Sequence, residues 1–266
     1  MTATTDDAPF PLGSVQAVAS RAWDLCLRED PVGLIAIPFV ISFPVTVFLT
    51  ILGEHVRNAP WIATDTSMIA PIFGVLPLVL FARVFGEAWI LWRADAEAHG
   101  RRVSFGETVK HAFSRTWYLV VVMLSTYALF QVGFVLFIIP AFLVAITCSF
   151  ANQAAVVGPG RLIASLKHSW DLVEHNIGAW FGMVAYWAVI FAGLGILVTI
   201  MRVTLESLMN GRTGFMIDLL LWLPLQGALL VFTACWTLFY RELEGRRHQQ
   251  RAVSQPVHPD IPARAS

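Results

Sequence analysis

The sequence predicts an all-α, polytopic membrane protein with six transmembrane helices, arranged as three repeats of a surface amphipathic helix plus a transmembrane hairpin. Three observations predict this fold class: composition, the spacing of uncharged runs, and a recurring short motif. Of the 266 residues, 57% are apolar and only 14% are charged, whereas soluble domains average about 45–50% and about 25%. The mean hydropathy of +0.67 is too high for a water-soluble globule, because so few polar side chains could not cover its surface.

The charge balance and the cysteines exclude several functional classes. Eighteen basic and eighteen acidic side chains give a formal net charge of zero, which argues against nucleic-acid binding. The expected partners are therefore the lipid bilayer and either other membrane proteins or a second copy of the chain. Three cysteines, Cys26, Cys148 and Cys235, are too few and too scattered for a zinc site or a disulfide framework. No metal and no other cofactor is expected.

Long uncharged runs define the six predicted spans, since a bilayer core about 30 Å thick needs about 20 apolar helical residues. Residues 117–157 carry no charge, and this run is too long for one helix and suits two, with a turn within 133–140. The second span contains two charged side chains, Arg83 and Glu87, and Asp218 lies at the start of the sixth. The six spans are predicted at 31–52, 69–91, the two halves of 117–157, 177–201 and 215–239.

The flanks of these spans set the domain boundaries. Residues 1–12 are predicted to be a disordered N-terminal tail without a signal peptide, and residues 246–266 a disordered cytoplasmic tail. The membrane domain between them, 13–245, divides into repeats at 13–99, 100–157 and 158–245.

Basic residues predict the orientation of the chain in the membrane. Fourteen of the eighteen fall in the N-terminal segment, the loops 92–116 and 158–176, and the C-terminal tail. The opposite side holds three: Arg57, Arg202 and Arg212. Both termini are therefore expected to face the cytoplasm.

A short pattern recurs before spans one, three and five, at 13–24, 103–114 and 160–171. The copies align on an aromatic residue, with apolar residues four and eight positions earlier, which places them on one helical face. The second and third copies also share a Lys-His pair. Each copy is predicted to be an amphipathic helix on the cytoplasmic membrane surface.

These stretches resemble a known bacterial family. Ile138-Ile139-Pro140-Ala141, the run from Leu162 to Val173, and Phe239-Tyr240-Arg241-Glu242-Leu243-Glu244-Gly245 are similar to the six-span membrane domain of glycerophosphoryl diester phosphodiesterases and its uncharacterised stand-alone relatives. The resemblance implies a multi-pass protein of the bacterial cytoplasmic (inner) membrane. It does not bring the phosphodiesterase activity, because that belongs to a separate soluble domain in the namesake enzymes.

Arg83 and Glu87, inside the second span, are the sharpest candidates for a functional pair. Their i, i+4 spacing places them on one helical face, and an unpaired arginine at mid-depth costs about 2.5–3.5 kcal/mol. The alternative is that Arg83 snorkels to the interface and the pair is structural. Uncharged polar residues in the spans are candidates either for interhelical hydrogen bonds or for the lining of a path. These are Gln131, Asn152, Gln153 and Gln226.

Basic residues beside the membrane are candidates for contact with anionic lipid headgroups. They are Lys110, His111, Lys167, His168, Arg241, Arg246 and Arg247.

No catalytic signature is present: the sequence lacks Gly-x-Ser-x-Gly, His-Glu-x-x-His and a phosphate-binding glycine loop. The sequence therefore favours a non-catalytic accessory, organising or regulatory component of the cell envelope. A small transporter or export component for lipid-like or amphipathic molecules is the first alternative. An enzyme acting on lipid headgroups is the second, and it requires Asp171, Glu174 and His175 to converge.

Overall fold

The structure is a computed structural model that describes residues 12–58, 69–158, 161–208 and 214–254. The regular elements of these residues are all helical, which confirms the all-α prediction there. In chain order they are α1 (Leu12–Asp24), the π-helical turns η2 (Leu25–Glu29) and η3 (Val32–Ala36), α2 (Ile37–Asn58), α3 (Ile69–Ala98), α4 (Phe105–Leu136), α5 (Ile138–Thr147), α6 (Ala151–Val156), α7 (Leu162–His175), α8 (Ile177–Leu208) and α9 (Gly214–Ser254).

Three of the described helices are long and apolar enough to cross a membrane. They are α4, α8 and the part of α9 between Leu220 and Arg247. Two shorter apolar helical stretches, Val32–Val45 and Ile138–Thr147, accompany them. The coarse prediction of a helical protein suited to a membrane is thus confirmed, and the count of six spans stays a prediction.

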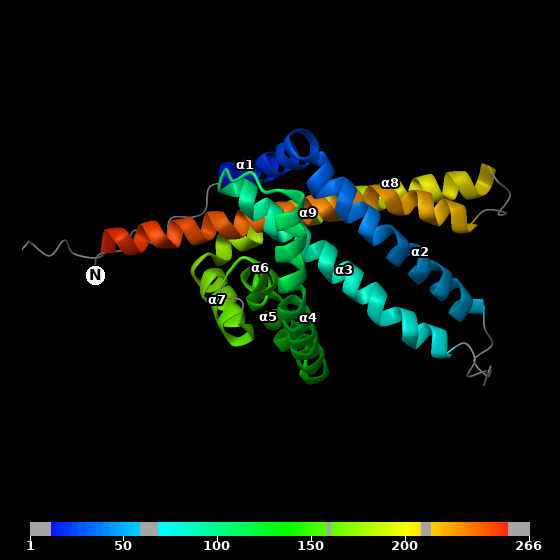
Figure 1. Ribbon diagram of the computed structural model, residues 1–266, viewed down its shortest axis with the longest axis horizontal. Helices are drawn as coiled ribbons and strands as arrows, with labels where there is room; N and C mark the ends of the chain where they lie inside the picture. The colour runs from blue at the N-terminus through cyan, green and yellow to red at the C-terminus, as the bar shows by residue number, and fades with distance from the viewer. Residues whose placement is uncertain (1–11, 59–68, 159–160, 209–213, 255–266) are drawn as a thin grey trace, which may run out of the picture.

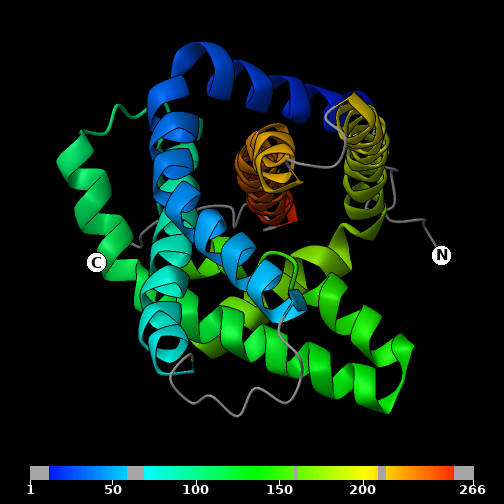
Figure 2. The ribbon, with the colours of Figure 1, turned by 90° about the vertical axis from the view of Figure 1, so that its right-hand side faces the viewer.

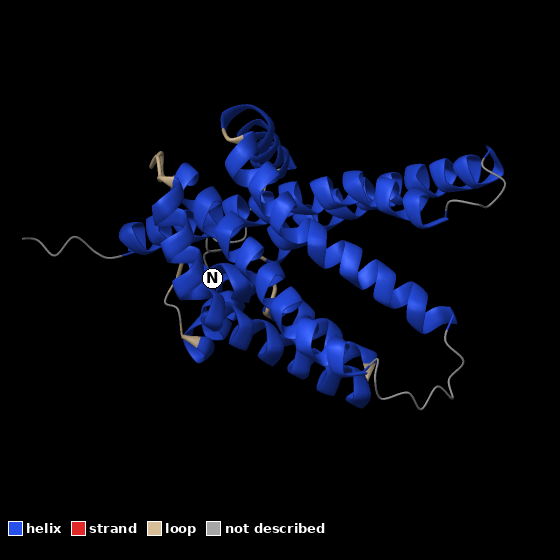
Figure 3. Cartoon of the chain, turned by 45° about the vertical axis from the view of Figure 1, so that its right-hand side comes forward, coloured by secondary structure: helices blue, strands red, loops and turns tan. Residues whose placement is uncertain are grey.

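The long helices pair into three hairpins, α2 with α3, α4 with α5, and α8 with α9 (Figure 1). The tips of the hairpins point in different directions (Figure 1), and the helices gather into one mass at the opposite end (Figure 3). We call this meeting region the base. It comprises residues 89–98 of α3, 105–116 of α4, α6, α7 and 230–247 of α9.

Helix α9 is the central element of the base, with α1, α3 and α8 packed around it (Figure 2). Its buried stretch contains Trp236, Phe239 and Tyr240. The fully buried ring of Phe150 lies 5.4 Å from the ring of Trp236 and 5.8 Å from the rings of Phe239 and Tyr240. Each such ring contributes about 1.5–3 kcal/mol by burial alone, so this aromatic cluster is a main source of stability in the base.

The turn of the α4/α5 hairpin lies where the sequence predicts it. Phe137 takes an extended conformation between the two helices, and Gly133 lets the returning chain approach closely. A Cβ atom on Gly133 would lie 2.8 Å from the backbone nitrogen and 2.9 Å from the Cα of Ala141. The close approach of α4 and α5 therefore depends on this glycine.

The predicted fourth span is not one helix, which corrects the sequence analysis. Residues 148–150 form a turn between α5 and α6. The Ser169 hydroxyl donates to the carbonyl of Thr147 at 2.6 Å and accepts from the amide of Phe150 at 3.0 Å. Because these bonds satisfy backbone groups that the break leaves free, the interruption is stable inside the protein.

The second predicted surface helix is also different, since 103–114 is not a separate helix. Residues from Phe105 onward run without a break into the apolar part of α4. The first copy is followed by Asp30-Pro31 and the third by Asn176, which interrupt the helix, whereas Ser114-Arg115-Thr116 contains no helix breaker. Only α1 and α7 are separate helices at the predicted positions.

The predicted tail 246–266 begins inside α9, which continues to Ser254. Arg246 pairs with Glu242 one turn earlier, and Arg247 pairs with Asp171 on α7 at 3.3 Å. These contacts extend the helix past the predicted boundary. Residues 1–11 and 255–266 lie outside the described residues.

Replacing Gly133 with alanine should separate the α4/α5 hairpin. We expect Gly133→Ala to destabilise the protein by about 1–3 kcal/mol, because the new methyl group meets backbone atoms that cannot move independently. Thermal unfolding in detergent micelles measures the effect. The matched control is Gly193→Ala in α8, where a Cβ meets nothing within 4 Å and helix propensity predicts a gain of up to about 1 kcal/mol. Equal effects at both positions would contradict the close-approach argument.

Candidate functional site

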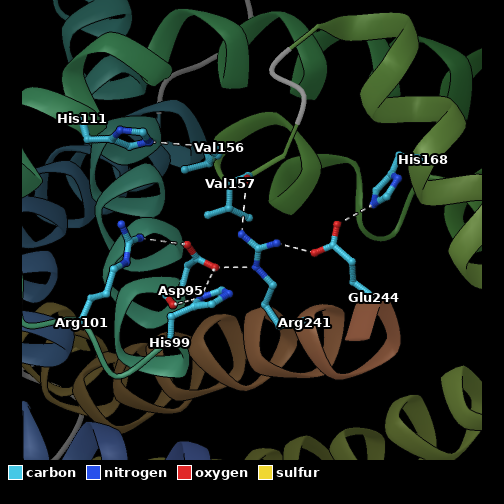
Figure 4. Close-up of polar contacts among 9 residues, drawn as sticks. All are labelled: Asp95, His99, Arg101, His111, Val156, Val157, His168, Arg241 and Glu244. Atoms are coloured by element: carbon cyan, nitrogen blue, oxygen red, sulfur yellow. Dashed lines mark hydrogen bonds and ion pairs between the residues drawn. The ribbon is translucent and has the colours of Figure 1, made fainter. Parts of the chain in front are cut away.

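A buried carboxylate lies at the centre of the base. Asp95, near the end of α3, is only 2% exposed. Its Oδ1 accepts a hydrogen bond from Nε of Arg241 on α9 at 2.5 Å (Figure 4). Removing one partner from such a buried pair costs about 3–5 kcal/mol, since a buried charge is left uncompensated. The pair therefore fixes α3 against α9.

Arg241 also connects α9 to two other elements. Its Nη2 donates to the carbonyl of Val157, directly after α6, at 3.2 Å, and its Nη1 pairs with Glu244. The other carboxylate oxygen of Glu244 lies 3.3 Å from Nε2 of His168 on α7. One continuous chain of ionisable groups thus runs from α3 through α9 to α7 (Figure 4).

Two more basic side chains surround the carboxylate of Asp95. The Nδ1 of His99 lies 3.4 Å from Oδ1, and an Nη of Arg101 lies 3.7 Å from Oδ2. We call Asp95, His99, Arg101, His168, Arg241 and Glu244 the base cluster. Both of its carboxylates are paired with basic groups inside the protein, so the cluster acts as a clamp between α3, α9 and α7.

A second clamp holds the start of the first hairpin. Asp30 pairs with Arg93 on α3 and accepts a hydrogen bond from the amide of Gly33 at 3.0 Å. The indole N–H of Trp89 donates to the carbonyl of Gly33 at 2.7 Å. Any side chain on Gly33 would overlap Arg93 and Asp30, so the glycine is required for this contact between η3 and α3.

The break between α5 and α6 is held from three helices. In addition to Ser169, the indole N–H of Trp180 on α8 donates to the hydroxyl of Ser149 at 2.9 Å. The indole N–H of Trp236 on α9 donates to the carbonyl of Ser149 at 3.1 Å. All three hairpins are therefore tied to one another through the base.

The predicted Arg83–Glu87 pair does not form an ion pair in the described part of the chain. Arg83 is exposed, whereas a carboxylate oxygen of Glu87 accepts a hydrogen bond from the amide of Asn152 on α6 at 2.8 Å. Glu87 and Asn152, which the sequence predicts as separate candidates, thus contact each other between α3 and α6.

The other polar candidates do not join this contact. Gln131 is exposed, Gln226 is half-buried, and Gln153 is 5% exposed. The side-chain oxygen of Gln153 has no hydrogen-bond partner in the described residues. The structure therefore brings one pair of these residues together and leaves the other three apart.

The predicted headgroup contacts fall into three groups. His168, Arg241, Arg246 and Arg247 have acidic partners inside the protein. The imidazole of His111 is stacked on Trp92 at 3.5 Å, with Nε2 at 3.4 Å from the carbonyl of Val156. Lys110 and Lys167 are exposed. These two lysines have no ion pair or hydrogen bond to any described residue, and they remain open to an external anion.

The three residues of the headgroup-enzyme alternative do not converge. Asp171 pairs with Arg247, and Glu174 accepts a hydrogen bond from the indole of Trp170 at 2.9 Å. The Nδ1 of His175 lies 2.8 Å from the carbonyl of Asp171. Within the described ranges, no group of three or more His, Cys, Asp or Glu side chains could hold a metal ion.

Local sequence patterns do not indicate that Asp95, Asp30, Arg93 and Ser169 organise the fold. The available signal was Asp95 between two alanines, Ala94 and Ala96, directly after an apolar run. Small neighbours favour burial of a helix face, and a buried aspartate needs a partner. Its partner Arg241 is 146 residues away in the chain, which no local pattern indicates.

Removing either member of the Asp95–Arg241 pair should destabilise the base. We expect Asp95→Ala and Arg241→Ala each to cost about 3 kcal/mol, and the double variant to cost clearly less than the sum. Thermal unfolding in detergent measures all three. The control is the exposed pair of Asp24 and Arg28, 3.0 Å apart on the surface, where alanine should cost less than about 1 kcal/mol. Strict additivity at Asp95 and Arg241 would contradict the clamp.

Comparison with known proteins was made at three levels. No protein-family model, no curated protein and no solved structure matches this chain.

Proposed function

We propose that the chain is a non-catalytic accessory or organising component of a bacterial inner membrane, inserted through six segments with both termini in the cytoplasm. The observation that carries the proposal is the contrast between the base and the hairpins. In the base, buried charges are paired inside the protein. The hairpins leave large apolar side chains uncovered, among them Val135 in α4 at 85% and Val189 in α8 at 73% exposure.

Apolar surface on this scale needs a cover that is not water. Lipid supplies it for helices long enough to span, and the candidate windows in α4 and α8 are only 17% and 11% buried inside the protein. Helices that bury so little of their own surface suit contact with lipid or with neighbouring membrane helices. The three hairpin pairs, together with α1 and α7, support three repeat units, although the middle surface helix is continuous with α4.

The polar residues of the second predicted span favour an accessory over a transporter. The carboxylate of Glu87 accepts a hydrogen bond from the side-chain amide of Asn152 inside the protein. The ring of Phe81 lies 5.9 Å from that of Phe113 and 6.5 Å from that of Trp117. Arg83, two residues from Phe81, thus lies near the level at which the uncharged part of α4 begins. Exposure there suits a snorkelling arginine.

Reconstituted vesicles distinguish the accessory from the lipid-transporter alternative. We expect movement of a fluorescently labelled phosphatidylethanolamine between leaflets at the rate of protein-free vesicles. Asn152→Ala should lower stability by about 0.6–1.7 kcal/mol, since one interhelical hydrogen bond is lost, and the exposed Gln131→Ala should not. Lipid movement above the protein-free rate that Glu87→Gln abolishes, with unfolding temperature unchanged, would overturn the accessory proposal.

Orientation is tested by labelling single cysteines in intact cells with a membrane-impermeant maleimide. We expect Leu208→Cys, at the end of α8, to react from outside, and Arg102→Cys, between α3 and α4, to react only after permeabilisation. Both carry Cys148→Ala. Cys26 is a silent background residue, because burial, with Cys235 and Asp30 nearby, raises the pKa of its thiol to about 12. Labelling of Arg102→Cys in sealed cells would reverse the proposed orientation.

A further inference from the structure

An open cavity of about 330 Å³ lies at the start of α4, outside the base cluster's central contacts. Its lining includes Trp92, Arg101, Glu107, Lys110, His111 and Ser114. One wall is aromatic, because His111 stacks on Trp92 at 3.5 Å and the guanidinium of Arg101 lies 5.1 Å from the centre of the Trp92 ring. The lining also includes the amine of Lys110 and the hydroxyl of Ser114.

The polar groups of this cavity include donors without an acceptor. Lys110 is exposed and forms no ion pair or hydrogen bond within the described residues. The indole N–H of Trp92 is buried and likewise has no partner there. Arg101 reaches Asp95 only at 3.7 Å through one nitrogen, which leaves other N–H groups available. Such a set of donors suits an anion with several oxygen atoms.

The lining contains one carboxylate, that of Glu107, and its repulsion of a bound anion is partly offset. Glu107 is held in the capping box of α4, where one oxygen accepts from both the amide and the hydroxyl of Ser104 at 2.9 Å. Its charge is directed at the helix start, which is the favourable end of the helix dipole. The lining therefore keeps two cations against one locally compensated carboxylate.

The same face of α4 turns apolar directly beyond the cavity. Lys110 and Ser114 are followed at helical spacing by Trp117, Val121 and Leu124, which are 65%, 47% and 63% exposed. From Ser114 to Leu124 the helix rises about 15 Å, which equals half of a bilayer core about 30 Å thick. This face of α4 is therefore polar at one end, and the length of its apolar part matches the thickness of one leaflet.

We propose that this cavity and stripe form a binding site for a phosphate-bearing lipid, with the phosphate between Lys110 and Arg101 and an acyl chain along Trp117, Val121 and Leu124. The site rests on the proposed insertion of α4 and adds a defined ligand class to it. Trp92 provides the floor of the headgroup part, and Ser114 marks the change from headgroup to chain.

The test uses the purified full-length chain in detergent, titrated with dioleoyl phosphatidylglycerol and followed by native mass spectrometry. Lys110→Glu should weaken the apparent affinity about tenfold, because charge reversal replaces attraction of the phosphate by repulsion. Lys167→Glu is the matched control, since Lys167 is exposed at the equivalent position of α7 and does not line the cavity. Unfolding temperatures without lipid should be equal for both variants and the unmodified protein.

Two soluble probes separate a lipid site from a free-anion site. Glycerol 3-phosphate and inorganic phosphate should each compete at least 100-fold more weakly than the lipid, since they lack the acyl chain. Equal competition would overturn the lipid assignment, and equal loss in Lys110→Glu and Lys167→Glu would overturn the site. Failure of the unmodified protein to float with phosphatidylcholine vesicles would count against the proposed membrane function, whereas floating without preference for phosphatidylglycerol would count against this site alone.

Discussion

The buried pairing of Asp95 with Arg241 is the interaction on which the rest of the structure depends. A carboxylate that is 2% exposed would be costly to bury alone, and its guanidinium partner also reaches Val157 and Glu244. The pair therefore fixes three elements at once. Helix α9 is the central element of the base, and this contact sets its position along α3. The same contact holds the hairpins of α3 and α9 together at the base.

The broken helix between α5 and α6 follows from the same arrangement. An interruption in an apolar segment leaves backbone groups without partners, and it is tolerated only where the protein supplies them. Ser169, Trp180 and Trp236 do so from α7, α8 and α9. Because α6 is thereby held in the base, Asn152 can reach Glu87 on α3. Asn152, a candidate in the sequence for the lining of a path, thus forms a hydrogen bond between two helices.

Local patterns predict the helices, the hairpin turn at Gly133, and the separate helices α1 and α7, because each depends on nearby residues. The contacts of the base are different. Asp95 resembles an ordinary polar residue at a helix end, and Ser169 resembles a residue on a surface helix. Both take their roles from partners far away in the chain, so neither role can be predicted from spacing. The resemblance to the six-span family remains a prediction, and it concerns turns and packing rather than these contacts.

The contacts also alter how the predicted excess of basic residues on one side is interpreted. Arg93, Arg241 and Arg247 are each paired with an acidic side chain, so counting basic residues alone overstates the charge available to lipid. Lys110 and Lys167 remain open, at equivalent positions of two sequence copies. Their neighbours differ, because His168 faces Glu244 whereas His111 stacks on Trp92. The second copy therefore has an aromatic wall beside its free lysine, and its helix continues into the apolar part of α4. Those two differences favour a lipid site in the second copy over one in the third.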